Sequence, residues 1–413
     1  MGIIKDAGIN RKSAWKRGEE LKEKIKPFLQ ARSKIPSGLK MDKEYTARRE
    51  KILNILGGNS ENWHDWHWQI KNRIDHTDIL RKIIDLTEQE VEEIEKVSFK
   101  YRWAISPYYA ALIAPADPAD PVRLQSVPSI QEYLDTRGGD DPMAELSTSP
   151  APLITRRYAD RLIINITNMC AMFCRHCQRR RNIGEIDRHS SQEDLAAALQ
   201  YIRENPEVRD VLITGGDPFT LPDEALAYLL EELEAIPHVE IKRFGTRTPV
   251  TLPQRITEKL CRLLANHLPL YINTQFNHPR EVTREAQQAC LRLARAGIGL
   301  GNQAVLLKGI NNNPHIMKKL NHELLKCMVR PYYIFHAKLV RGTSHFITRV
   351  EEGVEIMEQL RGYTSGLAVP TYIINAPDGH GKTPILPQYL ISLGNGYVTF
   401  RNWEGKVFKY PNF

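Results

Sequence analysis

Residues 161–181, RLIINITNMCAMFCRHCQRRR, show most clearly which fold this 413-residue chain adopts. The stretch joins a short β-rich run, 162–167, to a polar loop with three cysteines. Further β-rich runs follow at intervals of roughly 30 residues, with helical stretches between them. These runs are 210–216, 239–246, 270–276, 299–307 and 329–335. Such alternation of apolar strands and helices predicts an α/β fold with a parallel sheet covered by helices, either a barrel or an open, incomplete one.

The region before the sheet is predicted to be helical. Over residues 1–110, four charged segments place apolar residues at helical spacing: 13–30, 42–56, 61–74 and 88–105. We expect Trp63, Trp66 and Trp68 in the third segment to dock in a core.

A crossing segment, 111–155, separates this helical region from the sheet. Its prolines and aspartates, dense in 113–129, predict no regular element there. The partial barrel itself spans 156–365. The remainder, 366–413, holds a late strand, a loop with a lysine, and a hairpin that turns at Glu404-Gly405.

Composition excludes several classes of protein. The chain has 57 Lys and Arg against 49 Asp and Glu, a net charge of +8, and 42% hydrophobic residues, which excludes whole-chain disorder. No apolar run approaches the ~20 residues that span a bilayer, and the charged opening is unlike a secretory signal. Six cysteines are too few for a disulfide scaffold. We therefore expect a cytoplasmic enzyme that binds neither membranes nor nucleic acid, its basic excess being a solvated surface.

The cysteine loop predicts an inorganic centre. Cys170, Cys174 and Cys177 form C-x3-C-x2-C directly after the first strand. Structural zinc requires four ligands, and the other cysteines, Cys261, Cys290 and Cys327, fall within helical patterns and are expected in the core. An iron–sulfur cluster held by three thiolates instead leaves one iron open for a substrate or cofactor.

A lysine on a glycine-rich loop allows three interpretations. Residues 376–383 approach the phosphate-binding pattern G-x-x-x-x-G-K-[ST], with Ala376 in place of the first glycine. Pro384 and Pro387 follow, and they disfavour the helix that such a loop must open. A Schiff base between Lys382 and pyridoxal phosphate is the second interpretation, and a solvent-exposed lysine is the third.

The C-x3-C-x2-C spacing resembles the radical S-adenosylmethionine superfamily, in which the three cysteines hold a [4Fe–4S] cluster. From about residue 60 to the end, the chain resembles the lysine 2,3-aminomutase family within it. The motifs are specific, including CAMFCRHCQRRR, RTPVTLPQRIT, QFNHPREVT and NAPDGHGKTPILPQYLIS. The resemblance implies an incomplete (β/α)6 barrel of the TIM type with helical N-terminal extensions. It also implies S-adenosylmethionine and pyridoxal 5′-phosphate as cofactors, and migration of an amino group from C2 to C3 of an amino acid.

The same resemblance implies roles for individual residues. Lys382 matches the lysine that forms the Schiff base with pyridoxal phosphate, and Arg179 matches the arginine that pairs with the substrate α-carboxylate, which suits a guanidinium. The other matches are Arg157, Tyr158 and Arg161 for the pyridoxal phosphate group, and Gly215, Gly216, Asp217 and Gln303 for S-adenosylmethionine. An electron donor such as flavodoxin or ferredoxin is expected, as is a homo-oligomer.

Two departures from the lysine enzymes point to a different substrate. Lys338 and Asn375 stand where those enzymes have two aspartates that hold the side-chain ammonium of lysine. A cation and an amide donor there favour an anionic side chain, because a charge pair near 4 Å is worth about 4 kcal/mol even with a generous dielectric. We expect L-glutamate as substrate and β-glutamate (3-aminoglutarate) as product. Asn313 replaces a cysteine of the structural zinc site in the lysine enzymes, so we predict no zinc.

Alternatives remain at this point. The same chemistry could act on lysine, aspartate or arginine, or on a lysine of a protein. The chain could also be an iron–sulfur or nucleotide-binding module without enzymatic activity. Lys338 could reach solvent or pair with an internal acid such as Glu351.

Overall fold

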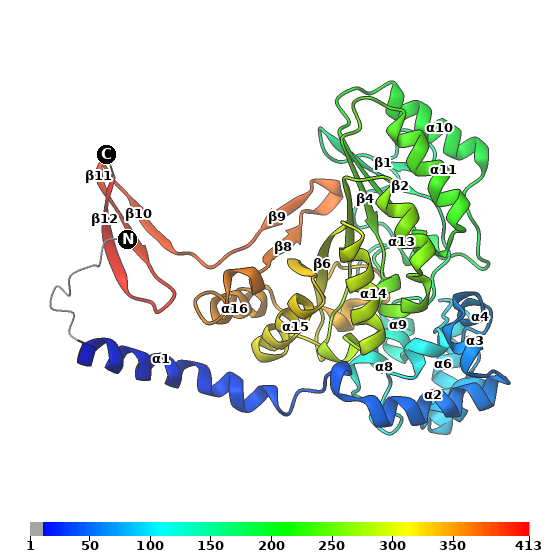
Figure 1. Ribbon diagram of the computed structural model, residues 1–413, viewed down its shortest axis with the longest axis horizontal. Coiled ribbons are helices and arrows are strands. Elements are labelled where there is room, and N and C mark those ends of the chain that lie inside the picture. Colours follow the sequence, from blue (N-terminus) through cyan, green and yellow to red (C-terminus); the bar gives the residue numbers. More distant parts are fainter. Residues whose placement is uncertain (1–10, 413) are drawn as a thin grey trace.

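The computed structural model describes residues 11–412, and at its centre is a nine-stranded sheet in which strand order follows chain order (Figure 1). Strands β2 to β8 are parallel, and β1 and β9 add antiparallel edges. The strands are β1 (Ile154–Thr155), β2 (Arg161–Asn165), β3 (Asp210–Thr214), β4 (Ile241–Gly245), β5 (Leu270–Thr274), β6 (Gly299–Leu306), β7 (Arg330–His336), β8 (Thr371–Asn375) and β9 (Lys382–Pro384). The edge strands β1 and β9 do not pair with each other, so the barrel is incomplete, as expected. The late strand that the sequence predicts is β8, which pairs with β7 in the same sheet. The sheet therefore has seven parallel strands.

Helices cover the outer face of the curved sheet, and each follows a strand as the alternation predicted (Figure 1). They are α10 (Gln192–Arg203), α11 (Asp223–Glu234), α12 (Thr248–Thr251), α13 (Glu258–Ala265), α14 (Arg284–Arg295), α15 (Pro314–Lys326) and α16 (Val350–Leu360). Side-chain caps fix where several begin: Ser191, Thr257, Thr283 and Asn313 each accept a backbone N–H in the first turn. Their apolar faces form one core with the strands, which includes the buried Cys261, Cys290 and Cys327, as predicted.

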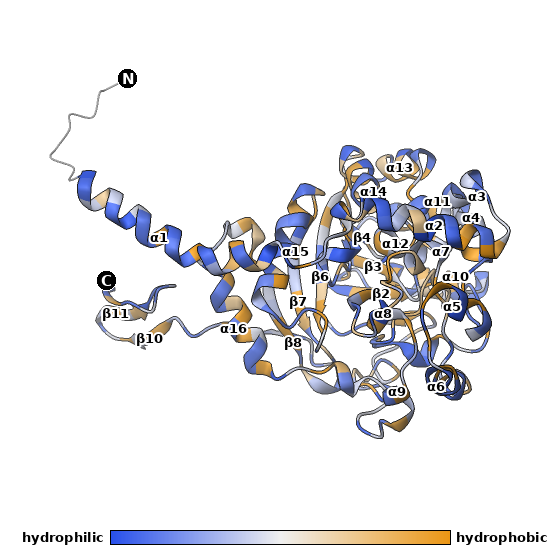
Figure 2. Ribbon diagram, turned by 90° about the horizontal axis from the view of Figure 1, so that it is seen from below, coloured by the Kyte–Doolittle hydropathy of each residue, from blue (hydrophilic) through white to orange (hydrophobic). Residues whose placement is uncertain are grey.

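The described part of the N-terminal region is helical, as expected. It contains α1 (Arg11–Arg32), α2 (Asp42–Leu56), α3 (Ser60–His64), α4 (Trp66–Lys71), α5 (Thr77–Ile83), α6 (Glu88–Ser98) and α7 (Pro107–Ala110). Trp63 is fully buried, whereas Trp66 is partly buried against the guanidinium of Arg255 and Trp68 packs at the edge of the core. α1 is mostly hydrophilic and projects from the body of the molecule (Figure 2).

The crossing segment differs from the prediction of no regular element, because it contains two short helices. One lies within its proline-rich part, 113–129, and the other begins directly after it. These are α8 (Pro121–Ser126) and α9 (Ile130–Leu134). Asp120 accepts the backbone N–H groups of Val122 and Arg123, both at 2.9 Å, and Pro121 occupies the first helical position. Asp-Pro therefore starts a helix here, where the sequence pattern predicted no regular element.

The C-terminal residues form a separate antiparallel sheet of three strands, β10 (Leu390–Leu393), β11 (Gly396–Arg401) and β12 (Val407–Asn412). The hairpin turn at Glu404-Gly405 lies between β11 and β12, as predicted. This sheet stands away from the barrel, near the start of α1 (Figure 1). Glu404 forms ion pairs with Arg17 at 2.8 Å and Lys24 at 3.4 Å, so α1 and the small sheet are in direct contact.

Single-turn 3-10 helices complete the described chain. They are η1 (Gly38–Lys40), η2 (Arg180–Asn182), η3 (Pro218–Thr220), η4 (Pro253–Arg255), η5 (Pro279–Glu281), η6 (Ser344–Phe346), η7 (Gly366–Ala368) and η8 (Pro377–Gly379). Over residues 11–412, no helix has the length and apolar character that crossing a membrane requires.

The packing of α16 on β8 gives a test of the fold. A Cβ added at Gly353 would lie 2.2 Å from Cζ of the buried Tyr372, whose hydroxyl oxygen forms a hydrogen bond with His336 Nδ1 at 2.8 Å. We expect Gly353→Ala to lower the free energy of unfolding by about 1–3 kcal/mol through overpacking, measured by denaturant titration. Gly366→Ala is the matched control, because no atom lies within 4 Å of its added Cβ. Equal stability of the two variants would contradict this packing.

Candidate active site

One cavity is lined by every residue for which the sequence predicts a role in a site. It has a volume of about 1870 Å³, including the part open to solvent. The residues are Arg157, Tyr158, Arg161, Cys170, Cys174, Cys177, Arg179, Gly215, Gly216, Asp217, Gln303, Lys338, Asn375 and Lys382. Most lie on loops at or after the carboxyl ends of the parallel strands, where barrel enzymes assemble their sites. Arg157, Tyr158 and Arg161 are exceptions, since the first two precede β2 and the third begins it.

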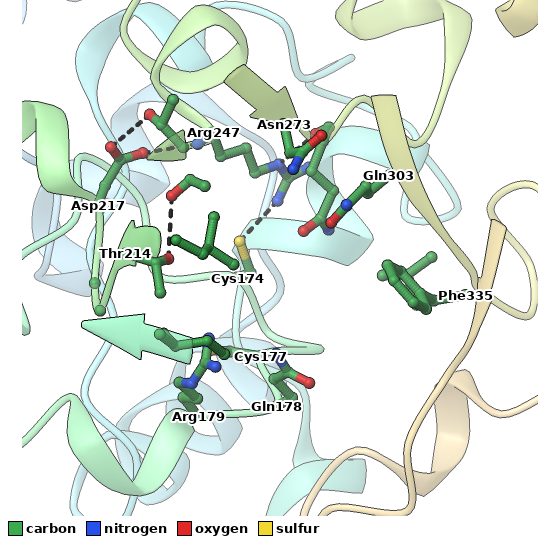
Figure 3. A pocket seen from close by; sticks show the side chains of 18 of the residues that line it. Cys174, Cys177, Gln178, Arg179, Thr214, Asp217, Arg247, Asn273, Gln303 and Phe335 are labelled. Atoms are coloured by element: carbon green, nitrogen blue, oxygen red, sulfur yellow. Dashed lines mark hydrogen bonds between the residues drawn. The ribbon is translucent and has the colours of Figure 1, made fainter. Parts of the chain in front are cut away.

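The cysteine loop enters the cavity directly after β2. All three thiols are partly buried, and burial raises the pKa of Cys170 and of Cys177. In the described chain, no group of three or more Cys, His, Asp or Glu side chains is arranged to hold a metal ion. Cys174 Sγ instead accepts a hydrogen bond from Arg247 Nη1 at 2.8 Å (Figure 3). Three thiols on one short loop still provide the donor set that an iron–sulfur cluster needs.

The glycine turn after β3 packs against the backbone of that cysteine loop. A Cβ at Gly215, where φ is +128°, would lie 2.4 Å from the carbonyl oxygen of Thr167, and one at Gly216 would lie 2.4 Å from that of Met169. Asp217 N also donates to Met169 O at 2.7 Å. Only glycine fits at either position, so the two loops meet backbone to backbone.

The carboxylate of Asp217 is engaged within the protein. It accepts hydrogen bonds from Thr246 Oγ1 at 2.6 Å, from the backbone N–H of Arg247 at 2.8 Å and from that of Phe219 at 3.1 Å (Figure 3). Burial raises its pKa. These contacts fix the loop after β4 against the glycine turn, a structural role that the sequence analysis did not foresee.

Lys382 lies among aromatic rings and arginines. Its Nζ is 5.5 Å from the ring centroid of Tyr158, 5.9 Å from that of Phe335 and 6.0 Å from that of Tyr333. Burial, together with the nearby guanidinium of Arg161, lowers its pKa to about 8. The solvent-exposed interpretation is therefore wrong for this lysine. An amine with a lowered pKa beside aromatic walls fits a covalently held, flat cofactor.

The chain around Lys382 rules out the nucleotide-phosphate interpretation. Lys382 begins strand β9, not a helix, so no helix N-terminus is available to cradle phosphate. Gly381, at φ +94°, brings its backbone against Tyr158, whose Oη accepts the N–H of Lys382 at 2.9 Å. The guanidinium carbon of Arg161 lies over the ring of this tyrosine, 3.9 Å from the ring centroid.

A carboxylate that the sequence analysis missed, Glu145, binds three arginines beside the cavity. It pairs with Arg179 at 2.9 Å, Arg181 at 3.0 Å and Arg157 at 3.5 Å. Burial alone would raise the pKa of Glu145, but these guanidinium groups outweigh it and hold the pKa below its usual value. No motif marked this residue, because it lies in an irregular segment far from its partners in sequence.

Lys338 and Asn375 face the cavity from neighbouring strands β7 and β8. Lys338 is half-buried, and its Nζ donates to Gln178 Oε1. Burial, then Arg179 and other nearby cations, lower its pKa to about 7. It neither extends into solvent nor pairs with Glu351, which contacts Arg349 instead, so both alternatives for Lys338 are excluded.

Asn375 and Asn313 contrast in how their side chains are used. Asn375 Nδ2 is buried without a hydrogen-bond partner in the described chain, a cost of about 1–3 kcal/mol unless a ligand accepts from it. Asn313 caps α15 by accepting from the N–H groups of His315 and Ile316. The first residue is available to a ligand, and the second is occupied by a structural role.

Comparison with known proteins identifies the family. Residues 164–320 match the radical SAM superfamily, and residues 357–413 match the model described as lysine-2,3-aminomutase. The glutamate 2,3-aminomutase of Clostridioides difficile is 57% identical over 393 residues, which cover 95% of this chain and 93% of that protein. The chain belongs to the lysine 2,3-aminomutase family of radical S-adenosylmethionine enzymes.

Two further relatives carry another name. The L-lysine 2,3-aminomutase of Clostridium subterminale is 49% identical over 350 residues, covering 84% of both chains. That of Bacillus subtilis is 47% identical over 352 residues, covering 85% of this chain and 75% of the relative. All of these are isomerases in reaction type, so the enzymatic interpretation is confirmed and the non-enzymatic module is excluded.

The cofactors of this family are a [4Fe–4S] cluster, S-adenosylmethionine and pyridoxal 5′-phosphate. The cavity fits them on its own chemistry. Three thiols from one loop suit the cluster, and a low-pKa lysine among aromatic rings and arginines suits pyridoxal phosphate. The individual residue roles given by the sequence analysis stay predictions.

The low pKa of Lys382 predicts how the apoprotein takes up pyridoxal phosphate. With a pKa of about 8, roughly a quarter of the amine is neutral at pH 7.5, against about 0.1% for an ordinary lysine. We expect the initial rate of attachment, followed by borohydride trapping, to rise with pH, with a midpoint near pH 8, and to level off about one pH unit higher. Lys382→Ala should lose the visible band of bound cofactor, whereas the exposed Lys308→Ala should keep it. A midpoint above pH 10, or a band retained in Lys382→Ala, would refute this assignment.

Proposed function

We propose that this enzyme converts L-glutamate to β-glutamate by moving the amino group from C2 to C3. The observation that carries the proposal is Lys338, a half-buried lysine that faces the cavity and donates to an amide oxygen. Its pKa of about 7 leaves about half of the amine protonated at pH 7, and a side-chain carboxylate beside it stabilises the charged form, whereas the ammonium of a lysine substrate opposes that form. The 57% identity to a glutamate 2,3-aminomutase supports the same conclusion.

The chain's own residues bind the two ends of the substrate. Arg179 holds the α-carboxylate, and Lys338 with the unpaired amide of Asn375 holds the γ-carboxylate. Two fixed anchors leave C2 and C3 with one orientation in the cavity, which is how a protein raises the rate of a cofactor's chemistry.

Separate groups of residues around the cavity bind the three cofactors. Cys170, Cys174 and Cys177 hold the cluster, while the Gly215-Gly216 turn, Asp217 and Gln303 border S-adenosylmethionine. Lys382 attaches pyridoxal phosphate, and Arg157, Tyr158 and Arg161 receive its phosphate. When bound, the cluster and S-adenosylmethionine supply radical chemistry, and pyridoxal phosphate supplies the conjugated system that carries the migrating nitrogen. The electron comes from a flavodoxin or a ferredoxin in the cytoplasm.

Amino migration on lysine is the second candidate. Relatives named L-lysine 2,3-aminomutase at 47–49% identity favour it. The cavity disfavours it, because the substrate's ammonium would meet the ammonium of Lys338.

A panel of amino acids tests the substrate. With protein reconstituted with iron, sulfide and both cofactors and then reduced without oxygen, we expect kcat/KM for glutamate to exceed that for lysine, aspartate and arginine by at least about 100-fold, since one buried charge contact is worth several kcal/mol. NMR identifies the products. Lys338→Met should lose about 100-fold in kcat/KM for glutamate, whereas Lys326→Met, an exposed lysine on α15, should behave as the wild type. Faster turnover of lysine than of glutamate would sink the proposal.

The enzyme also acts as a homo-oligomer in this proposal. The three-stranded C-terminal sheet stands apart from the barrel and exposes large apolar side chains, including Leu393, Val407 and Tyr410, which are 60–72% exposed. Apolar surface of this kind on a projecting sheet supports self-association.

Sedimentation tests this association. We expect a mass above 47.4 kDa in analytical ultracentrifugation at micromolar concentration. Leu393→Lys with Tyr410→Lys should shift the protein toward monomer. The matched control replaces two exposed residues elsewhere, Phe99→Lys and Leu146→Lys, and should leave the mass unchanged. A monomeric wild type would contradict this part of the proposal.

A further inference from the structure

The contact between Lys338 and Gln178 joins opposite sides of the cavity. Gln178 follows Cys177 on the loop after β2, the first parallel strand, and lies next to Arg179 (Figure 3). Lys338 follows β7, near the other edge of the sheet. The hydrogen bond from Lys338 Nζ to Gln178 Oε1 therefore crosses the open mouth of the barrel.

This partner holds the lysine without cancelling its charge. A carboxylate in place of the amide would form an ion pair and neutralise the cation. Within residues 11–412, no carboxylate makes an ion pair with Lys338, and Glu145, the acid that affects it most, is already bound by three arginines. An ammonium has three N–H donors, and an amide oxygen accepts one of them, so donors remain for a ligand in the cavity.

A second donor faces the same space without a partner. Asn375 Nδ2, at the end of β8, is buried and makes no hydrogen bond in the described chain. β8 pairs with β7, so Asn375 and Lys338 belong to neighbouring strand ends. Donors without acceptors on adjacent strands are what an anionic group would satisfy.

We propose that Gln178 is a specificity-determining residue, which holds the amine of Lys338 without an opposing charge, so that its remaining N–H donors and the positive charge that a bound carboxylate favours face the side chain of the substrate. This inference rests on the proposed function and deepens it. Gln178 acts through Lys338 and is a positioning residue. The ring centroid of Phe335 lies 5.4 Å from Nζ of Lys338 and offers no hydrogen-bond acceptor of its own. The amide oxygen of Gln178 is therefore the polar group that holds Nζ.

Two substitutions test the proposal in the reconstituted holoenzyme. Gln178→Glu keeps the shape of the side chain but neutralises Lys338, so KM for glutamate should rise at least 10-fold while kcat changes less than 3-fold. Gln178→Met removes the acceptor without adding charge and should raise KM about 3- to 10-fold. The same shift should appear in the dissociation constant of glutamate, measured from the absorption of bound pyridoxal phosphate. Gln359→Glu, an exposed glutamine on α16, is the matched control and should behave as the wild type.

A double-mutant cycle separates positioning from a general loss of structure. In a Lys338→Met background the Gln178→Met substitution should change KM less than 2-fold, because the residue on which it acts has been removed. Because Gln178 adjoins a cluster ligand, the iron content and the melting temperature of each variant are measured as well. Both should match those of the wild type. If Gln178→Glu does not fold, the cycle with Gln178→Met decides alone.

The outcomes are distinguishable from failure of the proposed function. A wild type that does not turn over glutamate refutes the function itself. If the wild type turns over glutamate, two results overturn only this inference. The first is that Gln178→Glu binds glutamate as tightly as the wild type. The second is that Gln178→Met raises KM by the same factor with Lys338 present and with Lys338→Met.

Discussion

The guanidinium of Arg247 connects the loops that form the cavity. The guanidinium donates from Nε to the carbonyl of Gln275 at 3.0 Å and from Nη1 to Cys174, and Nη2 pairs with Glu281 at 2.6 Å. The cysteine loop and the segment 275–281 therefore share one buried cation, and the backbone N–H of Arg247, which donates to Asp217, joins the glycine turn to them. Breaking a pair of this kind leaves an uncompensated buried charge and costs about 3–5 kcal/mol. The positions of the cysteine loop and the glycine turn both depend on this network.

Charge is the second constraint on the site. Arginines and lysines line one cavity, and burial together with their mutual repulsion lowers the pKa of Lys338 and of Lys382. Glu145 offsets part of this repulsion. The remaining positive potential suits ligands that carry phosphate and carboxylate groups. The same excess of positive charge therefore lowers the pKa of Lys382, the proposed cofactor lysine, to about 8 and that of Lys338, the proposed substrate lysine, to about 7, and an anion bound beside either amine favours its charged form.

Much of the fold followed from the sequence, because local pattern and tertiary structure agree for apolar strands between helices. The prediction failed at Asp120-Pro121, where the same dipeptide suits a turn and a helix start, and capping by Asp120 decided for the helix. In the site, motif residues such as Lys382 and the cysteines could be found because their spacing is local. Glu145 and Gln178 could not, since each acts through partners that only the folded chain brings near: Glu145 through arginines in two other segments, and Gln178 through a lysine 160 positions away. No periodicity or spacing encodes such contacts.

The ion pairs of Glu404 have a consequence for the ends of the chain. They join the first described helix to the last hairpin across 387 positions, so the two ends behave as one mechanical unit at a distance from the cavity (Figure 1). Removal of α1 would leave the carboxylate of Glu404 without Arg17 and Lys24 and the small sheet without its contact to the helix. Removal of the hairpin would leave those two cations without Glu404.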